Sequence, residues 1–107
     1  YRVPDVAVLR DRSYPRGHVL RPADFLLAVE VVSPSSVTTD RITKPAQYAA
    51  WGIEGFWRVE TEPLSLTAYV LRSGGDVYTE LGTWAAGETV EVAEPVAVRF
   101  GLDRLLD

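Results

Sequence analysis

The sequence predicts an α+β fold in which a mixed central β-sheet is flanked by one helix. The segment FLLAVEVV at Phe25–Val32 is almost continuously apolar, which is typical of a central strand covered on both faces. A helix signal follows between Thr39 and Trp51, and turn residues then divide the remaining chain into short strand-like segments. The order of strand, strand, helix and meander indicates a mixed sheet rather than a doubly wound one.

The first strand is expected at Val3 to Leu9, a short segment rich in β-branched residues. Residues 11–24 contain prolines and Gly17 among charged side chains, and they predict a loop. We expect the strands on either side of this loop, Val3 to Leu9 and Phe25 to Val32, to be adjacent in the sheet.

The helix should be capped by Asp40 or Thr43 and should reach Trp51, with Gly52 as its C-terminal stop. Pro45 is compatible with this helix only in its first turn, where the missing N–H would have had little or no partner. The apolar side of the helix, expected to pack on the sheet, is supplied by Ile42, Ala46, Ala49 and Ala50.

Downstream of the helix, the sequence predicts five further strands. They are expected at Phe56–Glu60, Leu66–Leu71, Val77–Leu81, Thr89–Val92 and Val96–Phe100. The segment SGGD at Ser73–Asp76 is the clearest hairpin turn, and Gly82 is expected to end the strand that follows it. Residues 101–107 (GLDRLLD) fit a brief terminal helix.

Length and composition favour a single domain over residues 1–107. A domain of this size buries roughly 60–70% of the surface that its unfolded chain exposes, which suffices for one core. With 47% hydrophobic and 24% charged residues the composition is globular. No apolar run approaches the ~18 residues needed to span a bilayer. The absence of cysteine and of a signal peptide fits a cytoplasmic location.

The chain contains no methionine and opens at Tyr1, so we expect it to be the C-terminal portion of a longer protein. A domain that lacks part of its covering layer should leave apolar surface open. We therefore expect self-association, with a homodimer as the simplest form.

The charge distribution restricts how this chain would contact nucleic acid. A net charge of −4 argues against a protein that coats nucleic acid, because such binding depends on Lys and Arg neutralising phosphates. The basic residues are ten Arg and one Lys, Lys44. The clearest basic patch is in the first loop and comprises Arg10, Arg12, Arg16 and Arg21. Any contact with DNA should therefore be local.

Glu30 is the anomaly in the most apolar segment. An unpaired carboxylate there would be costly, so Glu30 should be paired, protonated or bound to a metal. The sequence offers Asp5 near the start of the other early strand and Lys44 at the start of the helix after Glu30. Two converging carboxylates form a hard oxygen site suited to Mg²⁺ or Mn²⁺. The nearby lysine side chain would then orient a metal-bound water or, as a neutral amine, deprotonate it.

Several short motifs, in a specific order, carry a resemblance to a known family. They are PDVAV at 4–8, VEVVSPSS at 29–36, Asp40-Arg41 with Lys44 and Tyr48, Gly52-Ile53, and FWRVE at 56–60. In this order the chain resembles the Uma family of the restriction-endonuclease-like PD-(D/E)XK superfamily. The resemblance implies a restriction-endonuclease-like fold and a metal-dependent endonuclease that hydrolyses the phosphodiester bonds of nucleic acid, with DNA as substrate.

The resemblance also implies roles for individual residues. Asp5 and Glu30 would be the acids that bind Mg²⁺ or Mn²⁺, the backbone carbonyl of Val31 an additional ligand, and Lys44 the catalytic lysine. The superfamily's usual position for this lysine, two residues after the acid, holds Val32 here. Lys44 would therefore reach the site from the helix, a migration that is a pattern of the family.

Each of these residues also has a simpler explanation. Glu30 would form a structural ion pair with an arginine, Asp5 would begin a strand or a turn, and Lys44 would be an ordinary solvated residue. Tyr48 lies one turn beyond Lys44 on the same helix face, where packing explains it better than catalysis. His18 has no spaced partner, so neither a zinc site nor a Ser-His-Asp triad is expected.

Two other functions compete with the nuclease. One is a non-catalytic interaction or regulatory module that shares the nuclease fold, and the other is a structural fragment whose acids form salt bridges. Fold alone does not choose between them. Metal binding that depends on Glu30 separates the nuclease from both.

Overall fold

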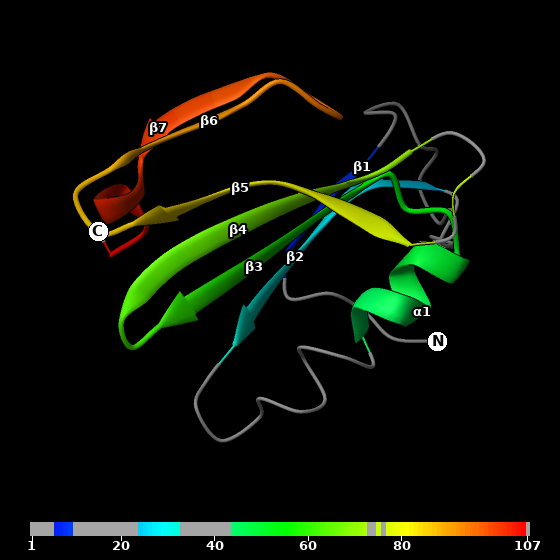
Figure 1. Ribbon diagram of the computed structural model, residues 1–107, viewed down its shortest axis with the longest axis horizontal. Coiled ribbons are helices and arrows are strands. Elements are labelled where there is room, and N and C mark those ends of the chain that lie inside the picture. Colours follow the sequence, from blue (N-terminus) through cyan, green and yellow to red (C-terminus); the bar gives the residue numbers. More distant parts are fainter. Residues whose placement is uncertain (1–5, 10–23, 33–43, 73–74, 76, 107) are drawn as a thin grey trace, which may run out of the picture.

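The computed structural model describes residues 6–9, 24–32, 44–72, 75 and 77–106 (Figure 1). The strands in these ranges are β1 (Val6–Leu9), β2 (Phe25–Val32), β3 (Gly55–Thr61), β4 (Leu64–Leu71), β5 (Tyr78–Ala85), β6 (Thr89–Val92) and β7 (Val98–Gly101). The helices are α1 (Lys44–Ala50) and the 3₁₀ helix η4 (Leu102–Leu106).

Strands β1 to β5 form one sheet in the order β1-β2-β3-β4-β5, and β6 pairs with β7 in a separate hairpin. Neighbouring strands of the large sheet are antiparallel except β2 and β3, which are parallel. A parallel pair needs a crossover connection, and α1 lies in that connection. The predicted mixed sheet and the adjacency of the first two strands are thus confirmed, and the flanking element is a helix of 7 residues.

The helix α1 ends where the sequence predicts. Gly52 has a φ of 77°, a left-handed conformation that glycine adopts without a steric penalty. Its N–H donates to the carbonyl of Ala49 at 3.0 Å, and the N–H of Ile53 donates to the carbonyl of Tyr48 at 3.1 Å. Together these bonds form a Schellman motif, whose usual apolar contact is supplied by Ile53 and Tyr48 in one buried cluster.

Some predicted boundaries are wrong. Strand β5 does not stop at Gly82 but continues to Ala85. Gly82 instead accommodates the Trp84 ring, since a Cβ at this position would lie 3.0 Å from the indole. Strand β7 begins at Val98 rather than Val96, and the terminal helix is a 3₁₀ helix. Outside the described ranges lie the predicted caps Asp40 and Thr43, the turn residues Ser73, Gly74 and Asp76, the loop arginines 10, 12, 16 and 21, and His18.

The five-stranded sheet separates two buried clusters. On the face toward α1, here called the helix face, Phe25, Ala28 and Phe56 of the sheet form a buried cluster with Tyr48 of α1 and with Ile53. The opposite face, here called the hairpin face, packs against β6, β7 and η4 through a larger apolar set: Leu27, Trp57, Val59, Leu64, Leu66, Ala68, Val90, Val92 and Leu102. Because side chains alternate along a strand, β2 contributes to both clusters.

Candidate active site

Glu30 lies in the middle of β2, and its side chain is completely buried. Leu27 and Val29 of the same strand contact the cluster on the hairpin face. Alternation therefore places Glu30 on the helix face. The sequence predicts that an acid in this position needs a partner, and α1 supplies one.

That partner is Tyr48, whose side chain is also completely buried. Its phenol O–H donates a hydrogen bond to Glu30 Oε1 at 2.5 Å. Its ring packs against Trp51 and Phe56. A buried carboxyl group is costly unless it is hydrogen-bonded, so this contact stabilises the acid in the core. The interpretation of Tyr48 as a packing residue was therefore incomplete: it packs, and it binds the acid.

Arg58 lies directly beside Glu30 on the parallel strand β3. Its guanidinium carbon is 5.5 Å from the centroid of the Tyr69 ring. Its Nε is buried without a hydrogen-bond partner, and no ion pair joins Arg58 to any residue that the structure describes. The ion pair that was the simpler explanation for Glu30 is therefore not formed with this neighbouring arginine.

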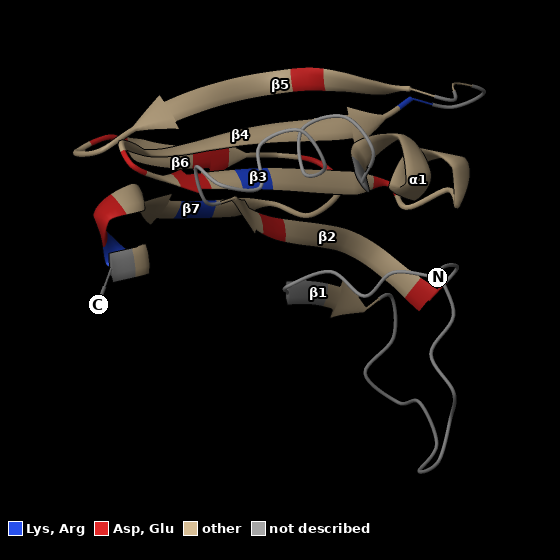
Figure 2. Cartoon of the chain, turned by 90° about the horizontal axis from the view of Figure 1, so that it is seen from below, with Lys and Arg blue, Asp and Glu red and all other residues tan. Residues whose placement is uncertain are grey.

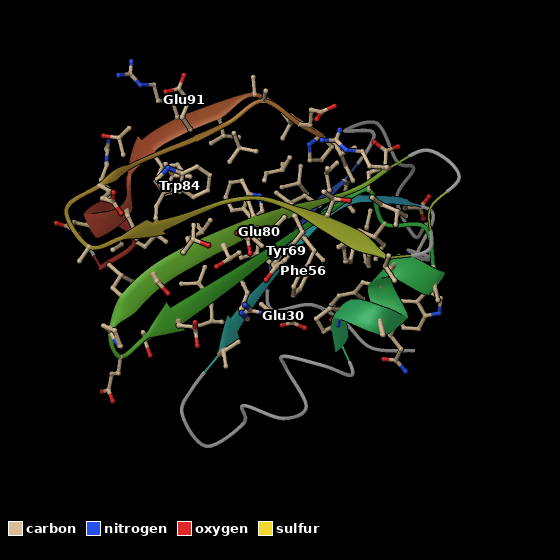
Figure 3. All side chains as sticks on the ribbon, viewed as in Figure 1. Glu30, Phe56, Tyr69, Glu80, Trp84 and Glu91 are labelled. Carbon is tan, nitrogen blue, oxygen red and sulfur yellow. The ribbon has the colours of Figure 1, made fainter. Side chains whose placement is uncertain are left out.

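Glu30 and Arg58 belong to a row of neighbouring polar residues that crosses the strands on the helix face. The strand register places Glu30 beside Arg58, and Arg58 beside Thr67. Thr67 lies beside Thr83, and their hydroxyl oxygens are 3.1 Å apart. The preceding row is apolar and aromatic until it reaches β5, and it contains Ala28, Phe56, Tyr69 and Glu80 (Figure 3). On β3 and β4 the helix face thus changes from aromatic to polar within two residues.

Charges on the described strands have mixed signs. Figure 2 shows acidic and basic segments interspersed, without a continuous basic stripe on the elements it colours. Arg72 Nη1 forms an ion pair with Glu94 Oε2 at 2.8 Å, and Arg99 Nε lies 4.0 Å from Glu91 Oε2. Exposed pairs of this kind neutralise local charge but add little stability. The prediction that any DNA contact is local stays a prediction, because the arginines of the first loop lie outside the described residues.

The structure describes some of the predicted site residues completely and others only in part or not at all. Val31 is 47% exposed, and its side chain lines a groove on the hairpin face. Lys44 is the first residue of α1, but its side chain and the whole of Asp5 lie outside the described residues. Within the ranges that the structure describes, no group of three His, Cys, Asp or Glu side chains is arranged to hold a metal. The structure therefore brings Glu30 and α1 together, and the roles of Asp5, Lys44 and the Val31 carbonyl stay predictions.

The mixed sheet, the parallel β2–β3 pair connected through a helix, and the acid within β2 are compatible with the restriction-endonuclease-like class of proteins. The sequence matches the family model described as "Uma2: Putative restriction endonuclease" over residues 1–104. This match spans nearly the whole chain, so the chain belongs to the Uma2 family, as its motifs predict. A comparison with curated proteins gives no match. None of the helices in the described ranges is long and apolar enough to cross a membrane.

Proposed function

We propose that the protein is a metal-dependent endonuclease that hydrolyses phosphodiester bonds of DNA, with Asp5 and Glu30 as ligands of Mg²⁺ or Mn²⁺. The observation that carries this proposal is the completely buried carboxyl group of Glu30 in β2, held by a residue of α1. Membership of a family described as restriction endonucleases supports the same chemistry. Carboxylates are hard oxygen donors, and Mg²⁺ needs only one or two of them besides water.

The strand register supports the proposed role of Asp5 as a metal ligand. The described antiparallel ladder pairs Val6 with Val29. One further step in the same register would set position 5 opposite Glu30. Directly opposed residues share one face, with Cβ atoms about 4.5–5.5 Å apart, a separation that allows two carboxylates to share one ion. Asp5 lies outside the described residues, so this placement is part of the proposal.

Helical periodicity supports the proposed role of Lys44 near the same site. Lys44 begins α1, and Tyr48 follows it by four residues, so the two positions lie on the same helix face. Because Tyr48 contacts Glu30, this face is turned toward the acid. We assign two roles to Lys44: as an ammonium it would orient the attacking water and balance the charge of the phosphate, and as a neutral amine it would accept the proton of that water. The metal ion, when bound, would polarise the phosphate oxygens and make a bound water more acidic.

The complete burial of Glu30 sets a physical condition on metal binding. Mg²⁺ usually keeps several waters, so a hydrated ion reaches the carboxylate only when the groups around it move apart. Tyr48 is one of these groups. Metal binding should therefore perturb Tyr48, which tyrosine ring resonances in an NMR titration would report.

Cleavage of supercoiled plasmid and of single-stranded DNA, with Mg²⁺ or Mn²⁺, tests the proposal. Glu30→Gln keeps an acceptor for Tyr48 but removes the charge. Loss of an outer partner of a metal site costs about 10–100-fold in activity, so loss of a direct ligand should lower the cleavage rate at least about 100-fold. Calorimetry should show the loss of metal binding in the same variant.

The matched control is Glu91→Gln, which changes an exposed acid on β6. It should leave both cleavage and metal binding at the level of the unsubstituted protein. A protein that neither binds the ions nor cleaves either DNA would overturn the proposal.

A second candidate function is a non-catalytic interaction or regulatory module with the same fold. The hydrogen bond from Tyr48 to the buried Glu30 favours it, since this contact alone gives the acid a structural role. In that case Glu30→Gln would change the stability of the protein while metal binding and cleavage are absent from both forms.

A further inference from the structure

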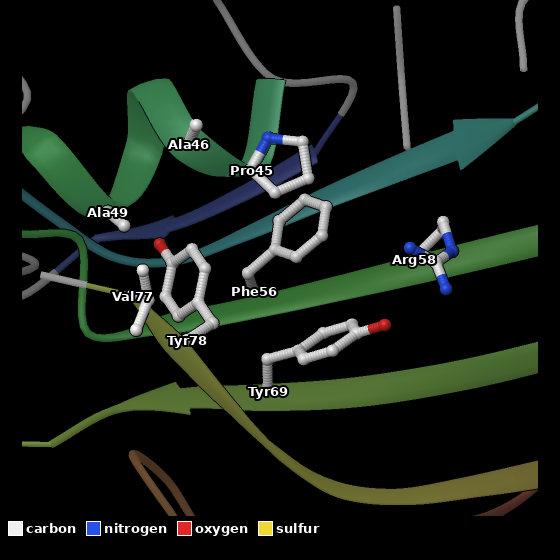
Figure 4. Close-up of a pocket in the computed structure, with 8 residues that line it drawn as sticks. All are labelled: Pro45, Ala46, Ala49, Phe56, Arg58, Tyr69, Val77 and Tyr78. Atoms are coloured by element: carbon white, nitrogen blue, oxygen red, sulfur yellow. The ribbon is translucent and has the colours of Figure 1, made fainter. Parts of the chain in front are cut away.

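A pocket of about 280 Å³ opens between α1 and strands β3 to β5 (Figure 4). One wall is aromatic and consists of Phe56, Tyr69 and Tyr78. The opposite wall contains Ala46 and Ala49 of α1, whose small side chains leave the space open. We call this space the α1 pocket. Its volume is just below the range of about 300–1,000 Å³ that is usual for ligand sites, which suits a single ring system.

The three rings of the aromatic wall support one another. The Phe56 centroid lies 5.6 Å from that of Tyr78 in a stacked arrangement, and 5.7 Å from that of Tyr69. The Tyr78 phenol donates a hydrogen bond to the carbonyl of Ile53 at 2.7 Å. Burial raises the pKa of Tyr78, so the phenol stays neutral and keeps donating at physiological pH. A wall that is already ordered loses little entropy when a planar ring packs on it.

Arg58 is the charged residue among those that line the α1 pocket. Its Nε is buried without a hydrogen-bond partner, and its guanidinium lies over the Tyr69 ring. A buried guanidinium N–H that lacks an acceptor is costly. An anion that accepted hydrogen bonds from the guanidinium would remove this cost, and the planar set of donors matches two oxygens of a phosphate.

The α1 pocket thus offers an aromatic wall for a planar ring and a guanidinium for an anion, which are the two chemistries of a nucleotide. We propose that it binds one unpaired nucleotide of the DNA substrate, with the base on the aromatic wall and the phosphate on Arg58. Because Arg58 lies directly beside Glu30, the bound phosphate would lie next to the candidate acid. This inference rests on the proposed nuclease function, and it specifies a single-stranded or locally unpaired substrate, since a base in a duplex must leave the stack to enter a pocket.

Binding measured in EDTA tests the inference independently of cleavage. The probes are a short fluorescein-labelled single strand, the duplex of the same sequence and a strand of the same length without bases, each followed by fluorescence anisotropy. Stacking of one base on aromatic side chains is worth about 5- to 150-fold in affinity. We therefore expect the single strand to bind about tenfold more tightly than either of the other two probes.

Substitutions with matched controls locate the binding. Ala46→Phe fills the α1 pocket from an exposed position and should weaken single-strand binding about tenfold. Ala50→Phe adds the same ring at an exposed position of α1 outside the pocket and should have no effect. Arg58→Gln should weaken binding and reduce the slope of log affinity against log salt by about 0.7. Arg99→Gln, an exposed arginine on β7, is its control, and circular dichroism verifies the fold of each variant.

Equal affinity for all three probes would overturn the inference, as would equal effects of Ala46→Phe and Ala50→Phe. Cleavage of fully paired DNA at the same rate by Ala46→Phe and the unsubstituted protein would also overturn it, while leaving the nuclease function intact. The predicted binding pattern in a protein that cleaves no DNA would support the pocket and reject the nuclease activity.

Discussion

The two faces of the five-stranded sheet use the same strands for different purposes. On the helix face, Glu30 and Arg58 bring charged groups into buried or half-buried positions beside an open pocket. On the hairpin face, the residues that alternate with them, such as Trp57 and Val59, enter an apolar cluster closed by β6, β7 and η4. Alternation along β2 and β3 is the cause, because each step along a strand changes the face.

This difference determines why a substitution on each face lowers the stability of the protein. On the hairpin face the main stabilising contribution is buried apolar area, so the loss of stability follows the volume deleted. On the helix face the loss depends on whether a buried polar group keeps a partner. A substitution on one face that behaves as expected for the other face would contradict this difference.

The largest expected effect on stability is on the hairpin face. Leu66→Ala deletes a completely buried side chain and should lower the free energy of unfolding by about 2–5 kcal/mol. The cleavage rate of the folded protein should remain unchanged, because Leu66 lies on the opposite face from Glu30. Urea denaturation measures the first effect, and a plasmid assay measures the second. Val77→Ala, at a position 71% exposed, is the control and should shift stability by less than about 0.5 kcal/mol.

A smaller effect is expected from the hydrogen bond on the helix face. Tyr48→Phe leaves the buried Glu30 without this donor and should cost about 1–3 kcal/mol, whereas Tyr78→Phe removes a bond to the Ile53 carbonyl and should cost about 0.5–1.5 kcal/mol. Adding Glu30→Gln distinguishes the two phenols. It should couple to Tyr48→Phe by at least about 0.5 kcal/mol and should be additive with Tyr78→Phe. Additivity in both pairs would mean that the Tyr48 bond does not stabilise the acid.

The sequence predicts those features that depend on local pattern. The apolar run at Phe25–Val32 locates β2 to the residue, and Gly52 locates the end of α1. Glu30 is recognisable because a single acid interrupts that run. Gly82 was expected to end a strand, because glycine is common in turns. Its missing side chain instead makes room for the Trp84 ring within β5. A local pattern does not distinguish these two uses of glycine.

The roles of Tyr48 and Arg58 depend on contacts between distant segments. Tyr48 meets Glu30 only because α1 crosses from β2 to β3 over this face of the sheet. Arg58 lies beside Glu30 because of the register of a parallel pair, which the crossover connection determines. A tyrosine four residues after the only lysine was the available signal for the first contact. No comparable signal existed for Arg58.

The smallest expected effect concerns self-association, for which the hairpin face offers a location. An apolar groove of about 450 Å³ lies on this face. Most of the large hydrophobic side chains exposed in the described ranges line it, namely Val8, Val31, Val96 and Leu105. Apolar surface gathered in this way marks an interaction site, and we expect a second copy of the chain to cover it.

Val96→Asp places a charge in this groove and should weaken the dimer about tenfold, which corresponds to about 1.4 kcal/mol. Val77→Asp is the matched control, because Val77 is 71% exposed and lines the α1 pocket on the other face. It should leave association unchanged. Sedimentation velocity over a range of concentrations measures both variants. A strict monomer at every concentration would show that the groove is no interface, and equal effects of the two substitutions would show that net charge, rather than the hairpin face, controls association.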